Sequence, residues 1–496
     1  MHNHLSFYDV FQEKAHLNPQ NPALYWDGKE IDYKTLFSRT RELAAGLSHL
    51  SPGSRIGVLG HNHPAFFHLI GAAAALNLTL VLINRRLGAD ELAHIIKDTQ
   101  PRLLIHDPEM AEKANALVQD HDGLEAALEM DSSLDTYYQT DGDVQPRPIQ
   151  PGDPFIIIHT AAVQGSPRGA VLSQENILLA NVQLLNAYGL SHASVHLNIL
   201  PLFHIMGLNL GLATLQAGGK NILMKGFDPA LCLELIQNQG VTLFGSFPPI
   251  LNSLLDAAKE NKGGHPDLAS LKVIAGIDAP DTIKKWQKLS GATFWTMYGQ
   301  TETSGLITFS PQDEAPGSAG RLSPLARIQI GDDQDQPLPT GKIGEILVRG
   351  PLVFQGYWNT PELNEHTRRN HWHHTGDLGM MDENGFLHFK GRRAEKELIK
   401  PGGENVFPAE VENALIQHSA IREVCVFGVP DPKFGEGIKA VCSLEAGCQV
   451  SREELIQFTG TRIAGYKKPR YIDFVPALPR TPDGEVDRAK IKSDFT

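Results

Sequence analysis

A stretch near residue 160 contains the residue types of a phosphate-binding loop, with several usual members replaced. The sequence "HTAAVQGSPRGAVLS" (159–173) follows an apolar run and contains two glycines, a threonine and an arginine: Gly165, Gly169, Thr160 and Arg168. Backbone N–H groups of a glycine-containing loop can cradle phosphate oxygens, and a guanidinium can neutralise their charge with forked donors. Alanine and valine stand at 161–163, where hydroxyls and glycine are usual. The stretch alone fits either a phosphate site or an ordinary turn.

Four other stretches carry polar or glycine-rich patterns, each too common to identify a site alone. "TMYGQTET" (296–303) places an aromatic ring, a glycine, hydroxyls and a carboxylate close together, and "HHTGDLG" (373–379) sets Asp377 between glycines. "IKPGGENVFPAEVE" (399–412) is a double-glycine turn that leads into a helix. "NILPLFHIMG" (198–207) ends a strand in proline and aromatic residues, which predicts a pocket wall. Only their joint arrangement can assign a chemistry.

The segments around these motifs predict an α/β fold. From "RIGVLG" (55–60) onwards, β-branched runs alternate with amphipathic stretches, and the alternation resumes from "FIIIHT" (155–160) to "KVIAGI" (272–277). Such β-α-β alternation implies parallel sheets covered by helices. We expect Pro and Gly at 145–154 to separate two α/β blocks, and the stretch 159–173 to join a strand to a helix.

Past residue 316 the sequence changes to short strands and turns, which predicts a small β-rich subdomain up to about residue 390. The residues beyond it predict a compact unit that begins with a helix at "FPAEVENALIQH" (407–418). We therefore expect a large N-terminal domain, residues 1–391, made of two α/β sheet subdomains and the β-rich subdomain. A small mobile α+β domain, residues 392–496, is expected to follow it.

Composition limits the classes of function. Hydrophobic residues make up 41% and charged residues 20% of the chain, and the formal net charge of -13 disfavours nucleic-acid partners and anionic membrane surfaces. The N-terminus lacks the basic and apolar regions of a signal peptide, and no apolar run predicts a transmembrane segment. Four cysteines without a CxxC pair are expected to be buried thiols in a reducing compartment. We expect a cytoplasmic protein.

The order and spacing of the motifs resemble the acyl-adenylate-forming superfamily of acyl-CoA synthetases, peptide-synthetase adenylation domains and luciferases. The resemblance covers almost the whole chain and includes "VFGVPDPKFGEGIKA" (426–440), "YKKPR" (466–470) and "LPRTPDGEVDR" (478–488). "GYWNTPE" (356–362) and "GENVFPAEVE" (403–412) look most like the acyl-CoA synthetase branch. The resemblance implies an ATP-dependent carboxylic acid–CoA ligase that forms acyl-AMP and pyrophosphate, and then acyl-CoA and AMP.

The resemblance also implies roles for the side chains of the nucleotide site. Tyr298 is expected to stack on adenine, Gly299 to line the adenylate pocket and Thr301 to hydrogen-bond the α-phosphate. Glu302 is expected to hold Mg²⁺, whose hard charge prefers oxygen ligands. Asp377 is expected to accept hydrogen bonds from the ribose hydroxyls.

Other roles implied by the resemblance concern the ribose, the phosphates and the acyl and CoA sites. Arg392 is expected to be the cationic neighbour of the ribose, and the phosphate loop is expected to contribute Thr160, Gly165, Arg168 and Gly169. His204 matches the gate of the acyl pocket, whose walls resemble "GSFPP" (245–249) and "AGIDAP" (275–280). Gly402 and Gly403 match the turn that lets the pantetheine arm of CoA pass close to the backbone.

The histidine-rich run "HWHH" (371–374) raises the question of a metal site. No partner cluster of metal-ligating residues accompanies it. We therefore expect this run to be a solvated loop.

Two segments depart from the family pattern. The spacing between Gly391 and Gly402 is two residues longer than usual, so the hinge of the C-terminal domain falls on Lys396 or Ala394, depending on the direction of counting. Near the C-terminus, Glu485 stands where the family places a lysine that meets the substrate carboxylate and the α-phosphate. Losing one preorganised donor typically costs about 10²–10³ in rate.

Replacing Glu485 with lysine is expected to accelerate ATP–pyrophosphate exchange, because it restores a cation beside two anionic groups. The stretches that serve thioester formation, including Gly402 and Gly403, keep the family pattern. Pyrophosphate exchange, measured with labelled pyrophosphate, checks this expectation. An unchanged or lower exchange rate in Glu485→Lys would show that Glu485 is not a deficit.

Alternatives to the leading interpretation remain open at this point. The acyl group could pass to the thiol of a carrier protein acting in trans, since no carrier domain follows "DRAKIKSDFT" (487–496) in the sequence. A non-catalytic relative that binds acyl or adenylate ligands is a second alternative, favoured by the altered loop and by Glu485. The resemblance to the acyl-CoA synthetase branch makes medium- or long-chain fatty acids the expected substrate, and aryl acids are the alternative. The sequence predicts no oligomeric state.

Overall fold

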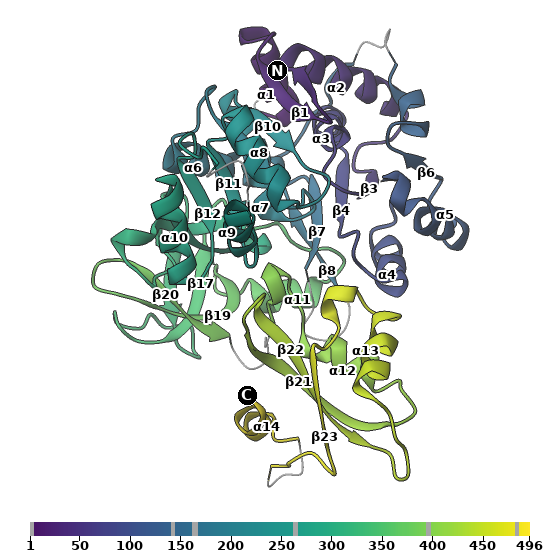
Figure 1. Cartoon of the computed structure of the whole chain (residues 1–496). Helices are drawn as coiled ribbons and strands as arrows, with labels where there is room; N and C mark the ends of the chain where they lie inside the picture. The colour runs from purple at the N-terminus through teal and green to yellow at the C-terminus, as the bar shows by residue number, and fades with distance from the viewer. Residues whose placement is uncertain (1–3, 140–143, 161–166, 261–265, 393–397, 482–485) are drawn as a thin grey trace.

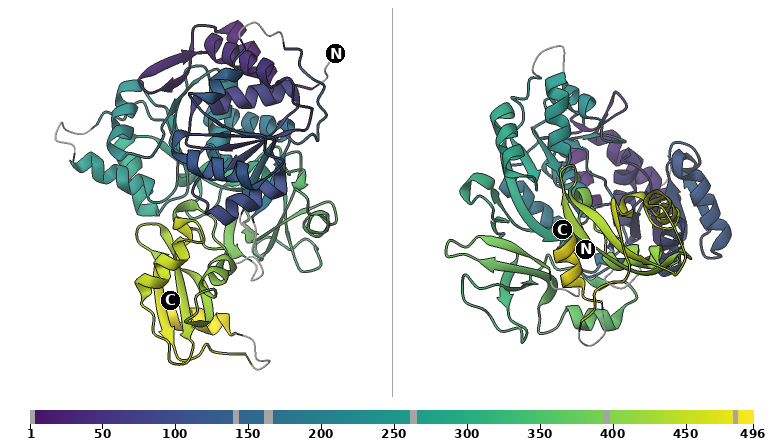
Figure 2. Two further views of the ribbon diagram at one scale, coloured as in Figure 1. Left: turned by 90° about the vertical axis from the view of Figure 1, so that its right-hand side faces the viewer. Right: turned by 60° about the horizontal axis from the view of Figure 1, so that its bottom comes forward.

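The computed structural model describes residues 4–139, 144–160, 167–260, 266–392, 398–481 and 486–496. Within these residues, two large mixed sheets and a four-stranded sheet form a large N-terminal domain, and a three-stranded sheet with its helices forms a small C-terminal domain (Figure 1). The C-terminal domain lies below the large domain in Figure 1, and the left-hand view of Figure 2 also shows it as a separate lobe. This is the predicted fold class.

The first sheet has seven strands in the order β18-β8-β7-β4-β3-β5-β6, and β3, β4, β5, β6 and β7 run parallel. Strands buried on both faces are expected to be almost continuously apolar, and β4, which is buried along its whole length, is apolar after Thr79. The strands of this sheet are β3 (Arg55–Leu59), β4 (Thr79–Ile83), β5 (Leu103–His106), β6 (Ala126–Glu129), β7 (Ile156–Thr160), β8 (Arg168–Leu172) and β18 (Gly356–Tyr357). Helices of the same part of the chain are α1 (Phe7–Leu17), α2 (Tyr33–Leu47), α3 (Pro64–Leu76), α4 (Ala89–Thr99) and α5 (Ala111–Asp120).

The second sheet has nine strands in the order β15-β14-β13-β12-β11-β9-β10-β1-β2. These strands are β1 (Pro22–Trp26), β2 (Lys29–Asp32), β9 (Val195–Asn198), β10 (Lys220–Leu223), β11 (Leu243–Ser246), β12 (Val273–Gly276), β13 (Thr293–Gln300), β14 (Gly305–Pro311) and β15 (Arg321–Leu322). The accompanying helices are α6 (Gln174–Tyr188), α7 (Ile205–Ala217), α8 (Pro229–Gln239), α9 (Ile250–Glu260) and α10 (Pro280–Ser290). Buried side chains of α8, α9 and α10 pack with those of β9, β10, β11, β12 and β13 in one core cluster.

The remaining sheets are smaller. The β-rich subdomain has the order β16-β17-β19-β20, with β16 (Arg327–Gly331), β17 (Gly344–Arg349), β19 (His373–Met381) and β20 (Leu387–Arg392), and α11 (Pro361–Thr367) precedes β19. The C-terminal sheet has the order β21-β22-β23, with β21 (Ile421–Asp431), β22 (Gly435–Leu444) and β23 (Tyr471–Val475). Its helices are α12 (Pro408–Leu415), α13 (Arg452–Gly460) and α14 (Arg488–Phe495).

Several sequence expectations are confirmed and others need correction. The strand–helix alternation, the β-rich subdomain and the helix at 408–415 are present. The Pro- and Gly-rich segment 145–154 does not separate two sheets, because β7, β8 and β18 return to the first sheet and β1 and β2 join the second. The neighbours of each strand in a sheet depend on contacts between segments far apart in the sequence, and local sequence patterns do not show these contacts.

The stretch 159–173 also differs from expectation. It joins β7 to β8, which pair antiparallel as a hairpin, rather than joining a strand to a helix. The run "RGAVL" is a short β-branched and apolar segment that suits a strand, and α6 begins only after the side chain of Ser173 caps it. Arg168 is therefore a strand residue.

The histidine run is likewise not a solvated loop at its C-terminal end. His373 and His374 are buried at the start of β19, where they pair with Val348 and Leu347 of β17. Cys232, Cys425 and Cys442 are buried as expected, whereas Cys448 is exposed. Among the described residues, no helix combines the length and apolar character needed to cross a membrane.

Candidate active site

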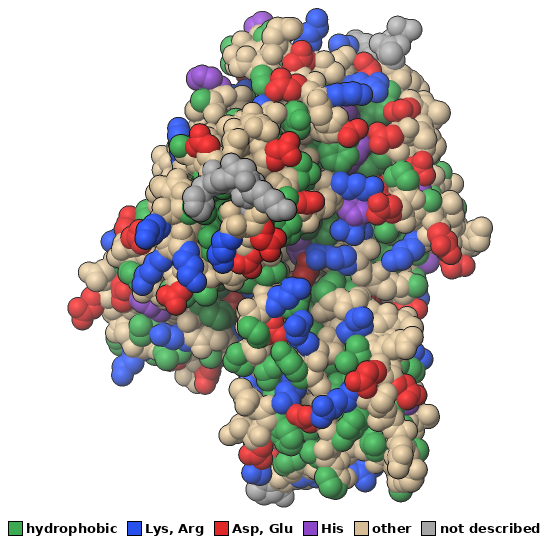
Figure 3. All heavy atoms as spheres, viewed as in Figure 1, with side chains coloured by type: hydrophobic (Ala, Val, Ile, Leu, Met, Phe, Trp, Pro, Cys, Tyr) green, Lys and Arg blue, Asp and Glu red, His purple; other side chains and the backbone are tan. Residues whose placement is uncertain are grey.

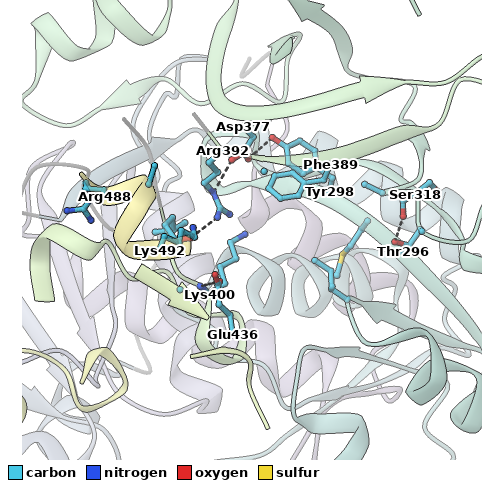
Figure 4. A pocket seen from close by; sticks show the side chains of 18 residues that line it. Thr296, Tyr298, Ser318, Asp377, Phe389, Arg392, Lys400, Glu436, Arg488 and Lys492 are labelled. Atoms are coloured by element: carbon cyan, nitrogen blue, oxygen red, sulfur yellow. Dashed lines mark hydrogen bonds and ion pairs between the residues drawn. The ribbon is translucent and has the colours of Figure 1, made fainter. Parts of the chain in front are cut away.

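A cavity of about 850 Å³ lies where the nine-stranded sheet, the β-rich subdomain and the C-terminal domain meet (Figure 4). Segments far apart in the sequence supply its walls, among them Thr296, Tyr298, Phe389, Lys400 and Glu436. Lys400 and Glu436 belong to the C-terminal side, and the others belong to the large domain. The position of the C-terminal domain therefore completes the cavity.

The carboxylate of Asp377 is fixed at the edge of this cavity by three side chains. The Tyr298 hydroxyl donates to Asp377 Oδ2 at 2.8 Å, and the Gln300 amide donates to the same oxygen at 2.7 Å. The guanidinium Nε of Arg392 lies 3.1 Å from Oδ1. Burial is the main reason, and the Asp377 charge the second, that the pKa of Tyr298 lies well above its usual range. The hydroxyl therefore stays protonated and donates its hydrogen bond to Asp377. Strands β13, β19 and β20 position these groups.

An aromatic wall adjoins this carboxylate. The Tyr298 and Phe389 ring centroids lie 6.2 Å apart, and Phe389, which also has the Arg392 guanidinium 5.6 Å from its ring centroid, is 42% exposed. Thr296 Oγ1 donates to the Ser318 carbonyl at 3.0 Å and ties the opposite wall to β13. A flat heteroaromatic ring has an apolar surface to lie on here, next to an anchored carboxylate.

A second, smaller cavity of about 110 Å³ shares Asp377, Arg392 and Lys400 with the first. Its other lining residues include the hydroxyls, carboxylate and guanidinium that the sequence analysis placed at the phosphates: Thr160, Thr301, Glu302 and Arg168. Glu302 Oε1 accepts hydrogen bonds from Thr160 Oγ1 at 3.1 Å and from the Tyr357 hydroxyl at 2.8 Å. The end of β7 thus meets the turn that follows β13.

Lys400 is the added cation that the C-terminal domain brings to this site. Its side chain points from that domain into the space between Arg392 and Tyr298 (Figure 4). Although the side chain is exposed to the solvent of the cavity, surrounding protein lowers the pKa of its ammonium to about 8, and the neighbouring Arg392 lowers it further. Asp377, Glu436 and Glu302 act in the opposite direction. An ammonium with such a pKa is available for an anionic ligand.

Contacts across the two domains hold this arrangement. Glu404, just past the double glycine, forms an ion pair with Arg86 and lies with both oxygens 3.2 Å from His204 Nε2. The Arg86 guanidinium lies 5.6 Å from the Phe203 ring centroid and 5.3 Å from that of Tyr466. Burial and the Arg86 charge lower the pKa of His204, so its neutral ring donates one N–H to Glu404. His204 therefore contacts the C-terminal domain in this arrangement.

The double-glycine turn packs directly against the segment "GSFPP" (245–249). A Cβ at Gly403 would lie 3.3 Å from Phe247 Cβ, and a Cβ at Gly402 would lie 3.2 Å from the Pro248 carbonyl oxygen. Both glycines have positive φ, 60° at Gly402 and 86° at Gly403. Glycine is required here both by conformation and by the closeness of the backbone to the other domain.

Gly403→Ala is expected to slow transfer of the acyl group to CoA at least about tenfold while leaving pyrophosphate exchange nearly unchanged, because the added methyl group both strains φ and crowds Phe247. Single-turnover acyl-CoA formation and pyrophosphate exchange are the two measurements. Gly447→Ala is the matched control, since Gly447 also has positive φ, at 80°, but has open space around its Cβ position. Equal slowing by both substitutions would assign the effect to general strain.

Most of the residues expected at the site come together. One wall unites Tyr298, Asp377 and Arg392, and the smaller cavity unites Thr160, Arg168, Gly299, Thr301 and Glu302. Gly169 stands apart, because a Cβ there would lie 2.7 Å from Ile157 Cγ2, so packing within the hairpin explains this glycine. Gly165, Glu485 and both hinge candidates, Lys396 and Ala394, lie outside the described residues.

Sequence reasoning missed five residues that the structure places at the site: Arg86, Gln300, Tyr357, Lys400 and Glu404. Tyr357 and Lys400 stand inside stretches already singled out, "GYWNTPE" and "IKPGGENVFPAEVE". Proximity to the glycines was the available signal for Lys400 and Glu404. Arg86 carries no local motif, because its partners lie far away in the sequence.

Comparisons with known proteins agree with this geometry. The model of the family described as "AMP-binding enzyme" matches residues 11–358, and that of the "AMP-binding enzyme C-terminal domain" matches residues 410–485. A feruloyl-CoA synthase of Amycolatopsis is 33% identical over 97% of each chain. A fatty acid–[acyl-carrier-protein] ligase of Streptomyces coeruleorubidus is 28% identical over 97% of this chain and 95% of its own.

A solved structure extends the comparison to three dimensions. An o-succinylbenzoate-CoA synthetase double mutant from Bacillus subtilis, bound to a product analogue, is 27% identical with a TM-score of 0.86 over 98% of each chain. A family match over more than half of the chain, together with a relative above 30% identity along nearly its full length, settles the family. The chain belongs to the AMP-binding enzyme family, and its relatives along nearly the whole length include AMP-forming acid–CoA ligases.

Proposed function

We propose that this protein is an AMP-forming carboxylic acid–CoA ligase whose substrate is an aromatic acid. The observation that carries the ligase proposal is the Asp377 carboxylate, anchored by Tyr298, Gln300 and Arg392 beside cavities that also hold Arg168 and Lys400. An anchored carboxylate suits the two hydroxyls of a ribose, and the cations beside it suit phosphate oxygens.

The first step joins the acid to AMP. A carboxylate oxygen of the acid attacks the α-phosphorus of ATP, a new P–O bond forms, and the bond from that phosphorus to pyrophosphate breaks. Arg168 and Thr301 bind the phosphate oxygens, while Tyr298 and Asp377 hold the nucleoside still. Donors fixed in place before the reaction stabilise the negative charge that gathers on the transferring group.

Mg²⁺ fits the donor set at Glu302. Its Oε1 atom is occupied by the two hydroxyls described above, and among the residues that the structure covers there is no group of three or more metal-ligating side chains. Mg²⁺ is commonly bound by one or two carboxylates together with substrate phosphates rather than by a complete protein cage. Glu302 would hold the ion, which when bound neutralises charge on the phosphates.

The second step transfers the acyl group to CoA. The CoA thiolate attacks the acyl carbonyl, the C–S bond forms, and the carbonyl–oxygen bond to AMP breaks. The tight turn at Gly402 and Gly403, which rests on Phe247, suits passage of a narrow pantetheine arm. Lys and Arg side chains also gather along the boundary between the two domains, where an anionic nucleotide can lie (Figure 3).

Support for an aromatic acid comes from the segments that the family resemblance assigns to the acyl pocket. Helix α7 behind His204 is buried from Met206 to Leu215, and a Cβ at Gly245 would lie 2.5 Å from Leu200 Cδ1. A wall packed this closely favours a short flat acid over a long alkyl chain. The relatives named for feruloyl and succinylbenzoyl substrates agree with this preference, whereas the relative named for fatty acids does not share it.

Loss of the Lys400 charge is expected to slow the second step as pH rises through about 8. The ammonium carries charge below its pKa and loses it above, so a phosphate contact weakens at high pH. The Lys400→Arg variant keeps its positive charge over this pH range. Ionisation of the CoA thiol affects the wild type and the variant alike, so it cancels in the ratio of the wild-type rate to the variant rate. The ratio of single-turnover rates should therefore fall from about pH 7 to about pH 9. A constant ratio would show that the Lys400 charge does not contribute.

The experiment that tests the proposal supplies purified protein with MgATP, CoA and a mixed pool of aryl and fatty acids. Mass spectrometry then identifies acyl-CoA products and AMP. Aroyl-CoA or arylalkenoyl-CoA formed together with AMP is the expected result. Fatty acyl-CoA in its place would reject the aromatic substrate and keep the ligase, and acyl-AMP without thioester would favour a carrier-protein acceptor.

A further inference from the structure

A buried chain of polar side chains lies behind the Asp377 turn, and no step of the proposed reaction uses it. Glu345 of β17 accepts the backbone N–H of Gly376 with Oε1 at 2.9 Å. Its other oxygen, Oε2, lies 3.2 Å from His374 Nδ1. Both side chains are buried, Glu345 at 4% and His374 at 3% exposure, so the contacts are sheltered from water. One carboxylate thus holds two points of the segment that leads into Asp377.

The chain continues outward from His374 to the surface. His374 Nε2 lies 3.6 Å from Asp335 Oδ2, which also accepts from Arg369 Nε at 3.2 Å and from Asn370 Nδ2 at 2.9 Å. Burial opposes the charge of Asp335, but the hydrogen bonds from Asn370 and Arg369 outweigh it and lower the pKa of this carboxyl. Glu345 therefore contacts one imidazole nitrogen of His374 at hydrogen-bond distance, and Asp335 lies at ion-pair distance from the other.

The backbone of the turn is tied to β17 by a second set of bonds. Thr375 Oγ1 donates to the Ile346 carbonyl at 2.7 Å and accepts the N–H of Asp377 at 3.1 Å. Gly376 between them has a φ of 69°, which a residue with a side chain rarely adopts. The backbone that leads into Asp377 is thus tied to β17 at two points, Thr375 and Gly376.

We propose that Glu345, His374 and Asp335 are positioning residues that hold the Asp377 carboxylate at the distance a ribose requires. The proposal rests on the proposed function, in which Asp377 binds the nucleoside. Asp377 Oδ2 already accepts two hydrogen bonds, so its remaining capacity toward a ligand depends on where the turn places it. If the Asp377 carboxylate is displaced slightly, we expect it to lose more of its contact with the two hydroxyls of a ribose than of its contact with the one hydroxyl of a 2′-deoxyribose.

The site is therefore expected to prefer ribose to 2′-deoxyribose, and the positioning residues behind Asp377 are expected to determine the size of this preference. When the turn is held, Asp377 reaches both hydroxyls of AMP, and 2′-deoxy-AMP lacks one partner. When the turn loosens, AMP loses that advantage while base stacking on Tyr298 remains. A substitution that only lowered the stability of the protein would weaken the binding of both nucleotides equally. The ratio of the two affinities therefore isolates the positioning effect.

The test measures binding of AMP and of 2′-deoxy-AMP by calorimetry in the wild type and in two variants. Glu345→Gln removes the charged acceptor, and Asp335→Asn alters the outer end of the chain, where folding is less at risk. The wild type should prefer AMP by at least about tenfold, and both variants should lose most of that preference. Glu383→Gln, an exposed carboxylate of the same subdomain, should keep it.

Two outcomes would overturn the inference in distinguishable ways. AMP binding with the wild-type preference retained in both Glu345→Gln and Asp335→Asn would reject the positioning role alone. A wild-type protein that binds neither nucleotide would reject the proposed function and this inference with it. Asp335→Asn decides the question if Glu345→Gln does not fold, which thermal unfolding of each variant reveals.

Discussion

Asp377→Ala is expected to lower kcat/KM for ATP by about 100- to 1,000-fold. The substitution removes the acceptor proposed for two ribose hydroxyls. It also leaves Tyr298 and Gln300 without their shared acceptor and Arg392 without the carboxylate that it contacts at 3.1 Å. The measurement is steady-state kinetics with ATP varied at saturating acid and CoA.

Two comparisons separate this loss from general damage. Glu383→Ala removes an exposed carboxylate from the same subdomain and should leave kcat/KM for ATP unchanged. Tyr298→Phe removes one of the donors to Asp377 and should cost less, about three- to tenfold. An Asp377→Ala enzyme with the wild-type kcat/KM for ATP would show that Asp377 does not bind the nucleotide.

Lys400→Ala is expected to slow acyl-CoA formation from preformed acyl-AMP by about 10²–10³-fold, the effect typical of losing one preorganised donor. Lys400 reaches the cavity beside Asp377 because the C-terminal domain lies against Phe247 and Arg86. The second step should therefore suffer more than pyrophosphate exchange. Rapid-quench measurement of the thioester from synthetic acyl-AMP gives the rate directly.

The matched control is Lys390→Ala, an exposed lysine on β20 that lines neither cavity described above. This variant should keep both partial reactions. If Lys400→Ala slows pyrophosphate exchange as much as thioester formation, the domain arrangement seen here is not specific to the second step. The role of Lys400 would then be general phosphate binding.

Local patterns in the sequence predicted most of the secondary structure but not the partners of each strand. The continuously apolar run of β4 and the alternation around it identify a parallel sheet. The placement of β18 beside β8, by contrast, depends on Gly356 and Tyr357 meeting Val171 and Ala170. Such pairing is decided by the closing of the whole fold, which a single sequence read along its length does not contain.

The cluster around Asp377, proposed to bind the nucleotide, was predictable because short motifs carry it. Tyr298, Asp377 and Arg392 stand in stretches whose order matches a family, and the structure places them within hydrogen-bond or ion-pair distance. His374 shows the opposite case. Its local composition is polar and predicts a loop, but pairing of β19 with β17 buries it beside Glu345.

The contacts across the domains escaped prediction for a further reason. Arg86 and Glu404 are ordinary charged residues in their local segments, and their ion pair exists only when the two domains meet. Lys400 likewise gains its lowered pKa from the cavity that the domains enclose. Residues whose chemistry comes from an interface have at most a weak local signal, so sequence motifs identify the fixed half of such a site better than the half that docks onto it.

One measurement tests the central claim most directly. The acid identified as substrate is labelled with ¹⁸O in its carboxylate and incubated with the enzyme, MgATP and CoA. Attack of a carboxylate oxygen on the α-phosphorus, followed by thiolate attack on the carbonyl, leaves one labelled oxygen in AMP. AMP that carries a single ¹⁸O atom is the predicted result, and acyl-CoA formed alongside unlabelled AMP, or alongside ADP and phosphate, would contradict an acyl-adenylate route.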